Sequence, residues 1–126
     1  MEIVGLGTDI IEVERIRAAL HRHGVRFVEH LFTEKEAKHA AKHHDPAPHI
    51  AGRFAAKEAV LKAIGTGLTK AISWHDIEIL SDSQGKPEVY FSDRLIELFP
   101  DATIYLSISH AKEYATATAI YTQLED

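Results

Sequence analysis

The amino-acid sequence predicts an α+β domain in which early helices pack on a small, mainly antiparallel sheet. Two observations lead to this class. Apolar residues recur at helical spacing in the first half of the chain, whereas alternating apolar and polar residues typical of strands gather in the second half. The 126 residues, 45% of them hydrophobic and 26% charged, suffice for one compact core. We therefore expect residues 1–126 to form a single domain.

The first residues predict a strand followed by a change to helical periodicity. Residues 3–11 are mostly apolar and β-branched, which indicates a strand that ends near Asp9. From Val13 the apolar residues recur at helical spacing up to Gly24, a common helix stop. The apolar patch over residues 27–32 predicts one or two further helical turns.

Two helices are expected in the middle of the chain. Thr33 and Glu36 match a capping box, and the helix that they start should run to about His44. A second helix should cover roughly residues 49–64 and stop at Gly65-Thr66-Gly67. This second helix carries most of the charged residues that are candidates for function.

The second half of the chain predicts strands around one short helix. Residues 77–80 and 88–91 should form a hairpin, and Ser92 should cap the helix that follows it. Residues 103–109 and 114–121 predict two more strands with alternating faces. We expect the hairpin and the final pair of strands to be antiparallel.

Composition and charge exclude several classes of protein. The chain contains no Cys, which excludes a disulfide scaffold, a thiol nucleophile and thiolate-held metals. Its apolar runs are far shorter than the ~20 residues that span a bilayer, and the first residues lack the pattern of a signal peptide. A net charge of −5 argues against general nucleic-acid binding. We expect a cytoplasmic protein that binds neither membranes nor nucleic acids.

The positive charge is concentrated in one segment. Between Arg15 and Val28 there are four Arg, two His and no acidic residue. Arg15 and Arg22 share one stripe of the predicted helix, opposite its apolar residues. A positive island on an otherwise negative chain predicts one acidic partner that docks there. The alternative is an ordinary solvated helix face.

Charged side chains interrupt the apolar stripe of the predicted helix over residues 49–64. Lys57 lies in the middle of the stripe, where an ammonium is costly unless an anion meets it, or unless its stem is buried and its charge reaches solvent. Glu58 borders the stripe and Lys62 lies one turn beyond, a spacing equally typical of a surface ion pair. Gly65-Thr66-Gly67 offers backbone N–H groups without side-chain bulk, which suits a phosphate.

Asp9 is the candidate for a second metal-binding carboxylate. It lies at the end of the first predicted strand, where it either caps the next segment or belongs to a site. Two carboxylates without thiols favour Mg²⁺, which usually keeps waters and substrate phosphates as its other ligands. The sequence therefore predicts that Asp9 and Glu58 converge around a divalent cation.

The nine His residues support a rival function, a non-catalytic histidine-rich metal-binding module. His39 and His43 are four residues apart on a predicted helix, a spacing that can chelate Zn²⁺ or Ni²⁺. His44, Asp45 or His49 could supply a further ligand. The alternative is that these histidines are exposed and solvated.

Five motifs follow one another along the chain: Gly5-Leu6-Gly7-Thr8-Asp9-Ile10-Ile11-Glu12, Arg53-Phe54-Ala55-Ala56-Lys57-Glu58-Ala59, Gly65-Thr66-Gly67, Gly85-Lys86-Pro87 and Ser107-Ile108-Ser109-His110. With them the chain resembles holo-acyl-carrier-protein synthase, the small bacterial type of 4′-phosphopantetheinyl transferase, over nearly its whole length. The resemblance implies a 4′-phosphopantetheinyl transferase-like fold. It also implies Mg²⁺-dependent transfer of 4′-phosphopantetheine from coenzyme A to a serine of apo-acyl carrier protein, which releases adenosine 3′,5′-bisphosphate.

The resemblance also implies the roles of individual residues. Asp9 and Glu58 would be the Mg²⁺ ligands, and Glu58 and Lys62 the catalytic residues. The residues expected to contact coenzyme A are Arg53, Lys57, Lys62, Gly65, Gly67, Lys86, Ser109 and His110. Arg15 and Arg22 would face acyl carrier proteins, which are strongly acidic.

The family is known for a homotrimer with active sites at the subunit interfaces. One face of the last predicted strand carries the small residues Ala115, Ala117 and Ala119. Small side chains permit close packing, so we expect this face to be a candidate for contact with another subunit.

Overall fold

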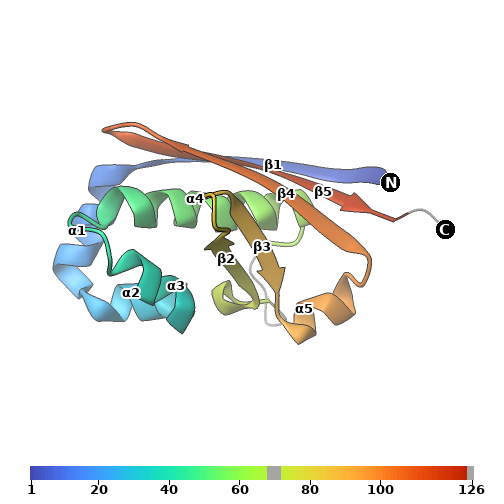
Figure 1. The fold of residues 1–126 in the computed structure, drawn as a ribbon, viewed down its shortest axis with the longest axis horizontal. Coiled ribbons are helices and arrows are strands. Elements are labelled where there is room, and N and C mark those ends of the chain that lie inside the picture. Colours follow the sequence, from blue (N-terminus) through green and yellow to red (C-terminus); the bar gives the residue numbers. More distant parts are fainter. Residues whose placement is uncertain (68–71, 125–126) are drawn as a thin grey trace.

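The structure, a computed structural model, describes residues 1–67 and 72–124. Within these ranges, three strands form one sheet in the order β1 (Glu2–Glu12), β5 (Tyr114–Gln123) and β4 (Ala102–His110). Both neighbouring pairs are antiparallel. Figure 1 shows the sheet as one layer, with the helices and a separate hairpin below it. The predicted α+β class and the antiparallel pairing are confirmed.

The long helix α4 (Ala47–Ile64) packs on the inner face of this sheet. A Cβ added at Gly7 would lie 1.9 Å from the carbonyl oxygen of Ala59, so only Gly lets the strand come this close to the helix. The same holds at Gly5, where the obstructing atom is the carbonyl oxygen of Ala63. Helix α4 and strand β1 therefore meet almost backbone to backbone.

The small-residue face of β5 lies against α4 and not against another subunit. Ala115, Ala117 and Ala119 are all buried inside this chain. The prediction that this face could meet another subunit is wrong, because alternate β5 residues point to α4 on the inner side of the sheet. The small side chains are needed there for the close approach of the helix.

Short helices cover the end of α4, at the left of Figure 1. They are α1 (Val13–His23), α2 (Val25–Leu31) and α3 (Glu34–Ala40). The capping box at Thr33 is confirmed, since its hydroxyl accepts from the Glu36 backbone N–H and Glu36 accepts from the Thr33 backbone N–H. Helix α3 ends at Ala40, earlier than the predicted His44, and a turn leads to Pro46 at the start of α4.

A hairpin and one more helix complete the chain. Strands β2 (Ile77–Ser81) and β3 (Pro87–Phe91) pair antiparallel, as predicted. Helix α5 (Asp93–Leu98) follows, and the Ser92 hydroxyl caps it by accepting from the Leu95 backbone N–H. The 3₁₀ turn η1 (Trp74–Asp76) before β2 has no counterpart in the sequence-based prediction.

Lys57 forms an ion pair inside the core. Its side chain is fully buried, and its ammonium donates to Glu36 Oε1 at 2.8 Å, to the Leu31 carbonyl at 2.8 Å and to the Trp74 carbonyl at 3.0 Å. Each of the three N–H groups of the ammonium can thus donate to one protein acceptor. The predicted contact of Lys57 with a coenzyme A phosphate is wrong, because the ammonium points into the core, and the alternative of a charge that reaches solvent is wrong for the same reason.

Glu36 connects this ion pair to the rest of the fold. Its Oε1 also accepts from the Thr33 backbone N–H and its Oε2 accepts from the Ile79 backbone N–H at 2.9 Å. One carboxylate therefore joins α3, α4 and β2. Burial lowers the pKa of Lys57, and the opposite charge of Glu36 works against this shift.

The outer face of the sheet is exposed and partly apolar. Leu6, Ile120 and Tyr105 form one row across β1, β5 and β4, and Ile10 lies on the same face. Leu6 is 64% exposed and Ile10 is 63% exposed. Among the described residues, no helix has both the length and the apolar character needed to cross a membrane.

Replacing Lys57 with Met leaves the Glu36 carboxylate buried without its counter-charge. We expect Lys57→Met to lower the free energy of unfolding by about 3–5 kcal/mol. The double variant Lys57→Met/Glu36→Gln removes both charges and should lose less than the single variant. Urea denaturation followed by circular dichroism measures both values. An equal or larger loss in the double variant would contradict the coupling of the two charges.

Candidate active site

The structure brings Asp9, Glu58 and Lys62 together beside the close contact of β1 and α4. Asp9 is on the inner face of β1, where it pairs with Ala117 of β5. Lys62 Nζ lies 3.2 Å from Asp9 Oδ1 and also donates to the Thr8 carbonyl at 2.9 Å. Glu58 is one helical turn before Lys62 and is half-buried. The predicted convergence of the two acidic residues agrees with this geometry.

The electrostatics of this cluster favour a cation. The pKa of Glu58 is raised, first by burial and second by the negative charge of Asp9, while Lys62 partly opposes the shift. The stability that Glu58 contributes is therefore greatest below the ordinary carboxyl pKa and is lost as the pH rises through the raised value. Lys62 thus provides a single basic side chain beside two acidic ones. A divalent cation would relieve their repulsion.

An open cavity of about 560 Å³ adjoins the acidic cluster. It is lined by Glu58, Leu61, Lys62, Gly65, Thr66 and Gly67. Gly65 adopts the left-handed conformation (φ 85°) and ends α4, and its N–H donates to the Leu61 carbonyl at 2.9 Å. The predicted Gly segment does border the cavity. The Gly65 amide is nevertheless used as a helix cap, so it is not a free donor for a phosphate.

A second cavity of about 180 Å³ lies on the other side of α4. Its lining residues are His49, Gly52, Arg53, Gly85, Pro87, Ile108 and His110. The Arg53 side chain is mostly buried and donates to the Ser81 hydroxyl at 2.5 Å. Burial lowers the pKa of Arg53 and Glu36 opposes this. A guanidinium that is buried at a cavity wall suits an anion that enters the cavity.

Ser109 and Lys86, two of the predicted coenzyme A contacts, lie away from this second cavity. Ser109 pairs with Thr116 and is exposed on the outer face of the sheet, whereas His110 pairs with Ala115 on the inner face. Because strand residues alternate between faces, Ser109 and His110 cannot reach the same cavity of one chain. Lys86 lines a different groove of about 620 Å³, between the hairpin and β4.

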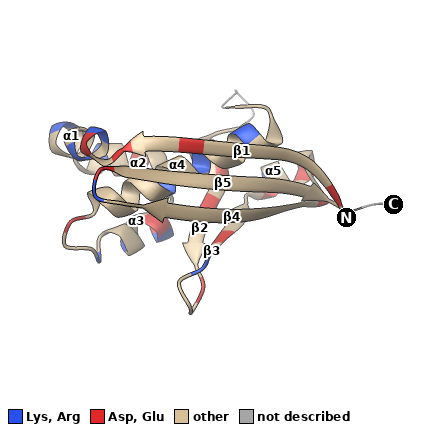
Figure 2. Cartoon of the chain, turned by 90° about the horizontal axis from the view of Figure 1, so that it is seen from above, with Lys and Arg blue, Asp and Glu red and all other residues tan. Residues whose placement is uncertain are grey.

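The two cavities belong to opposite edges of the sheet. Asp9 is on β1 and His110 is on β4, and β5 separates these strands. Figure 2 shows β1 and β4 as the two edges of the sheet, with α4 behind it. Two strand spacings place the edges about 10 Å apart. Helix α4 stands between the acidic cluster and the pocket of Arg53.

The basic island lies on α1 and the start of α2 and is only partly available to a partner. Arg15 and Arg22 are exposed. Arg17 instead forms ion pairs with Glu14 and Asp45 within the chain. The exposed part of the island therefore includes Arg15 and Arg22, which the sequence selected, and also Arg26 of α2.

Paired carboxylates, a lysine beside them and a second cationic cavity are typical of enzymes that act on phosphorylated substrates. The sequence model of the 4′-phosphopantetheinyl transferase superfamily matches residues 5–119, and the chain belongs to this superfamily. The predicted family resemblance is thereby confirmed.

Individual relatives agree with this family. A protein from Protochlamydia amoebophila, named holo-[acyl-carrier-protein] synthase, is 50% identical over 118 residues, which cover 94% of this chain and 97% of the relative. A protein of the same name from Chlamydia pneumoniae is 51% identical over 120 residues, which cover 95% and 98%. A holo-(acyl-carrier-protein) synthase from Bacillus anthracis, solved in complex with CoA (3′,5′-ADP), has a TM-score of 0.83 at 41% identity, covering 96% of this chain and 97% of that one.

Some residues of these sites had no individual signal in the sequence. Ser81, which positions Arg53, is distant in the chain and looks like any polar strand end. Ile108 and Gly52 approach each other so closely that a Cβ on Gly52 would lie 3.0 Å from the Ile108 side chain. Such neighbours can be recognised only when the position of α4 relative to both edges of the sheet is known.

Proposed function

We propose that this protein transfers 4′-phosphopantetheine from coenzyme A to a serine of apo-acyl carrier protein and releases adenosine 3′,5′-bisphosphate. The observation that carries the proposal is the cluster of Asp9, Glu58 and Lys62 beside an open cavity. It occurs in a chain that belongs to the 4′-phosphopantetheinyl transferase superfamily. The names of the relatives supply the acceptor, and the Bacillus anthracis complex supplies the donor.

Asp9 and Glu58 fit Mg²⁺ as oxygen ligands from two different elements. Their mutual repulsion and the half-buried position of Glu58 are the observations that support a cation there. When bound, Mg²⁺ neutralises charge on the diphosphate of coenzyme A and orients it. The side chains of this protein provide the other contributions to the reaction, which are charge stabilisation and proton transfer.

Lys62 and Glu58 have distinct roles in the proposed reaction. The serine hydroxyl attacks the phosphorus that carries the pantetheine arm, and the bond from this phosphorus to the leaving phosphate breaks. Lys62 is half-exposed at the cavity, where its ammonium can stabilise negative charge on the phosphate oxygens. Glu58 accepts the serine proton. Its carboxylate lines the same cavity as Lys62, which places it to act as the base.

The pocket of Arg53 and His110 suits another phosphate group of coenzyme A. The guanidinium of Arg53 lies in the wall of the cavity and is held by Ser81. His110, on the β4 edge, faces the same cavity. An anion here would compensate the burial of Arg53.

We propose that three copies of the chain form the active enzyme. The apolar row of Leu6, Ile120 and Tyr105 supports a subunit interface on the outer face of the sheet. The position of the acidic cluster and the Arg53 pocket on opposite edges supports sites that combine the β1 edge of one copy with the β4 edge of the next. Ser109 on the outer face would then be available to a neighbouring copy.

The acidic partner fits the exposed arginines of α1. Arg15 and Arg22 face away from the buried residues Val13 and Ile16 of the same helix. Acyl carrier protein can therefore dock without any change in the packing of α1.

Membership of a transferase family argues against a metal-binding module as the main function of the chain. The cytoplasmic location stays a prediction.

Mass spectrometry of apo-acyl carrier protein incubated with coenzyme A, Mg²⁺ and this protein tests the reaction. We expect the carrier protein to gain the mass of phosphopantetheine, and chelation of Mg²⁺ should abolish the gain. Glu58→Gln keeps the shape of the side chain but removes its charge, and should reduce the rate at least about a hundredfold. A wild-type rate in this variant, or no transfer by the wild-type protein, would refute the proposed site.

Mixing two inactive variants tests whether sites are shared between copies. Glu58→Gln damages the β1 edge, and His110→Ala damages the β4 edge. After joint unfolding and refolding at equal amounts, random assembly should place two intact edges together at about one quarter of the interfaces. Activity near that fraction is expected. No recovery in assemblies shown by light scattering to contain both variants would place each site within one chain.

Charge reversal at Arg15 tests the docking surface. We expect Arg15→Glu to raise KM for acyl carrier protein about fivefold or more and to leave KM for coenzyme A nearly unchanged. Arg15→Lys is the matched control, since it keeps the charge and should behave nearly as wild type. Steady-state kinetics with each substrate varied in turn measure both constants. Equal changes in both KM values would count against a docking role.

A further inference from the structure

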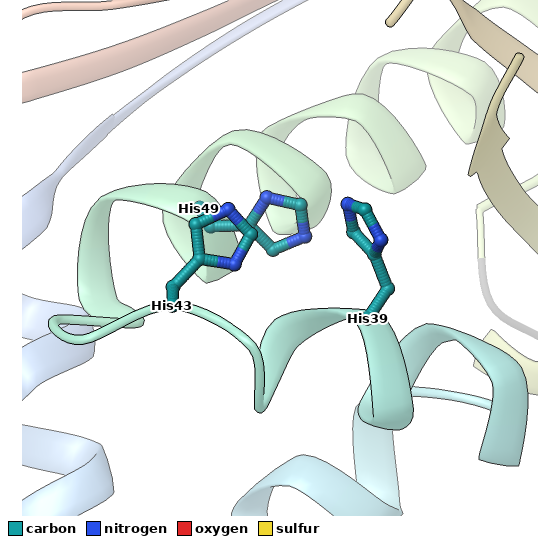
Figure 3. A group of neighbouring side chains, drawn as sticks. All are labelled: His39, His43 and His49. Atoms are coloured by element: carbon teal, nitrogen blue, oxygen red, sulfur yellow. The ribbon is translucent and has the colours of Figure 1, made fainter. Parts of the chain in front are cut away.

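We propose that His39, His43 and His49 form a binding site for a transition-metal cation such as Zn²⁺, separate from the carboxylates of the active site. One ligand nitrogen from each ring lies within 4.8 Å of the others. Figure 3 shows the three imidazoles turned toward the same space. The ring centroids of His43 and His49 are 4.3 Å apart, and those of His39 and His49 are 4.9 Å apart.

The three ligands come from successive parts of the chain. His39 is in the last turn of α3, His43 is in the turn that follows, and His49 is in the first turn of α4. Among the residues that the structure describes, none of these imidazoles has a hydrogen-bond partner, and each of the three rings contacts the other two. Their nitrogens are thus free to bind a cation.

Only a small adjustment would complete the coordination geometry. Zn–N distances of about 2.0–2.1 Å in a tetrahedral site put ligand nitrogens roughly 3.4 Å apart. The ligand nitrogens lie within 4.8 Å of one another, so they are only slightly too far apart. Rotation of the imidazoles about their side-chain bonds can close this difference. His43 is exposed, which leaves the fourth position of the metal open to water.

The ligand atoms determine which metals fit the site. Three imidazole nitrogens disfavour Mg²⁺ and Ca²⁺, which bind oxygen, and favour Zn²⁺, Ni²⁺ or Cu²⁺.

A metal at this site would restrain the connection between α3 and α4. It would also fix His49, which lines the cavity of Arg53 and His110. The inference does not rest on the proposed transferase reaction, because its ligands, its metal and its readout are all different from those of the acidic cluster.

Zn²⁺ titration of the full chain without a polyhistidine tag tests the site. Excess Mg²⁺ in the buffer keeps Asp9 and Glu58 from competing for Zn²⁺. Isothermal titration calorimetry should show one Zn²⁺ per chain at this site, and Co²⁺ in its place should give the visible absorption of tetrahedral coordination. We expect His43→Gln to weaken Zn²⁺ binding at least about tenfold, because one of the three ligands is lost.

His44→Gln is the matched control, because His44 is adjacent and exposed but lies outside the cluster. It should leave the Zn²⁺ affinity unchanged. His49→Gln provides a second test from α4, with circular dichroism to confirm its fold. Unaltered Zn²⁺ binding in folded His43→Gln and His49→Gln proteins would overturn the proposal. An equal loss in His44→Gln, or no binding at millimolar Zn²⁺, would do so as well.

Discussion

The near-backbone contact of β1 with α4 determines where the functional groups of this protein can be. Gly5 and Gly7 leave room for the carbonyl oxygens of Ala63 and Ala59, and no side chain separates the two elements. Asp9 follows two residues after Gly7 on the same face of the strand, and Glu58 and Lys62 flank Ala59 on the helix. The same contact that closes the core therefore brings two carboxylates and a lysine together.

A buried ion pair secures the other side of the helix. Lys57 points away from the acidic cluster and joins α4 to α3 and β2 through Glu36. Lys57 therefore has a structural role, whereas the adjacent Glu58 lies at the candidate site. Separating them over two faces of α4 keeps the Lys57 ammonium away from the carboxylates that would hold a cation.

The sequence predicted the fold better than the details of the site. Periodicity, the capping box at Thr33 and the helix stop at Gly65 located the elements, because each depends on residues close together in the chain. Glu36 was recognised as part of a cap, yet its pairing with Lys57 depends on how α3 meets α4. The polar face of Ser109 follows from the alternation along its strand, whereas the cavity that His110 lines depends on how β4 meets α4 and the hairpin, which local patterns do not determine.

The exposed outer face of the sheet also affects how single folded chains behave toward one another. A single folded chain presents the apolar row of Leu6, Ile120 and Tyr105 to other copies nearby, together with β1 and β4, the edge strands of the sheet within the described residues. Such surfaces are prone to aggregation. Exposed Glu2 and Glu12 bracket β1 and act as gatekeepers, because like charges repel a second β1 strand that approaches along the same edge.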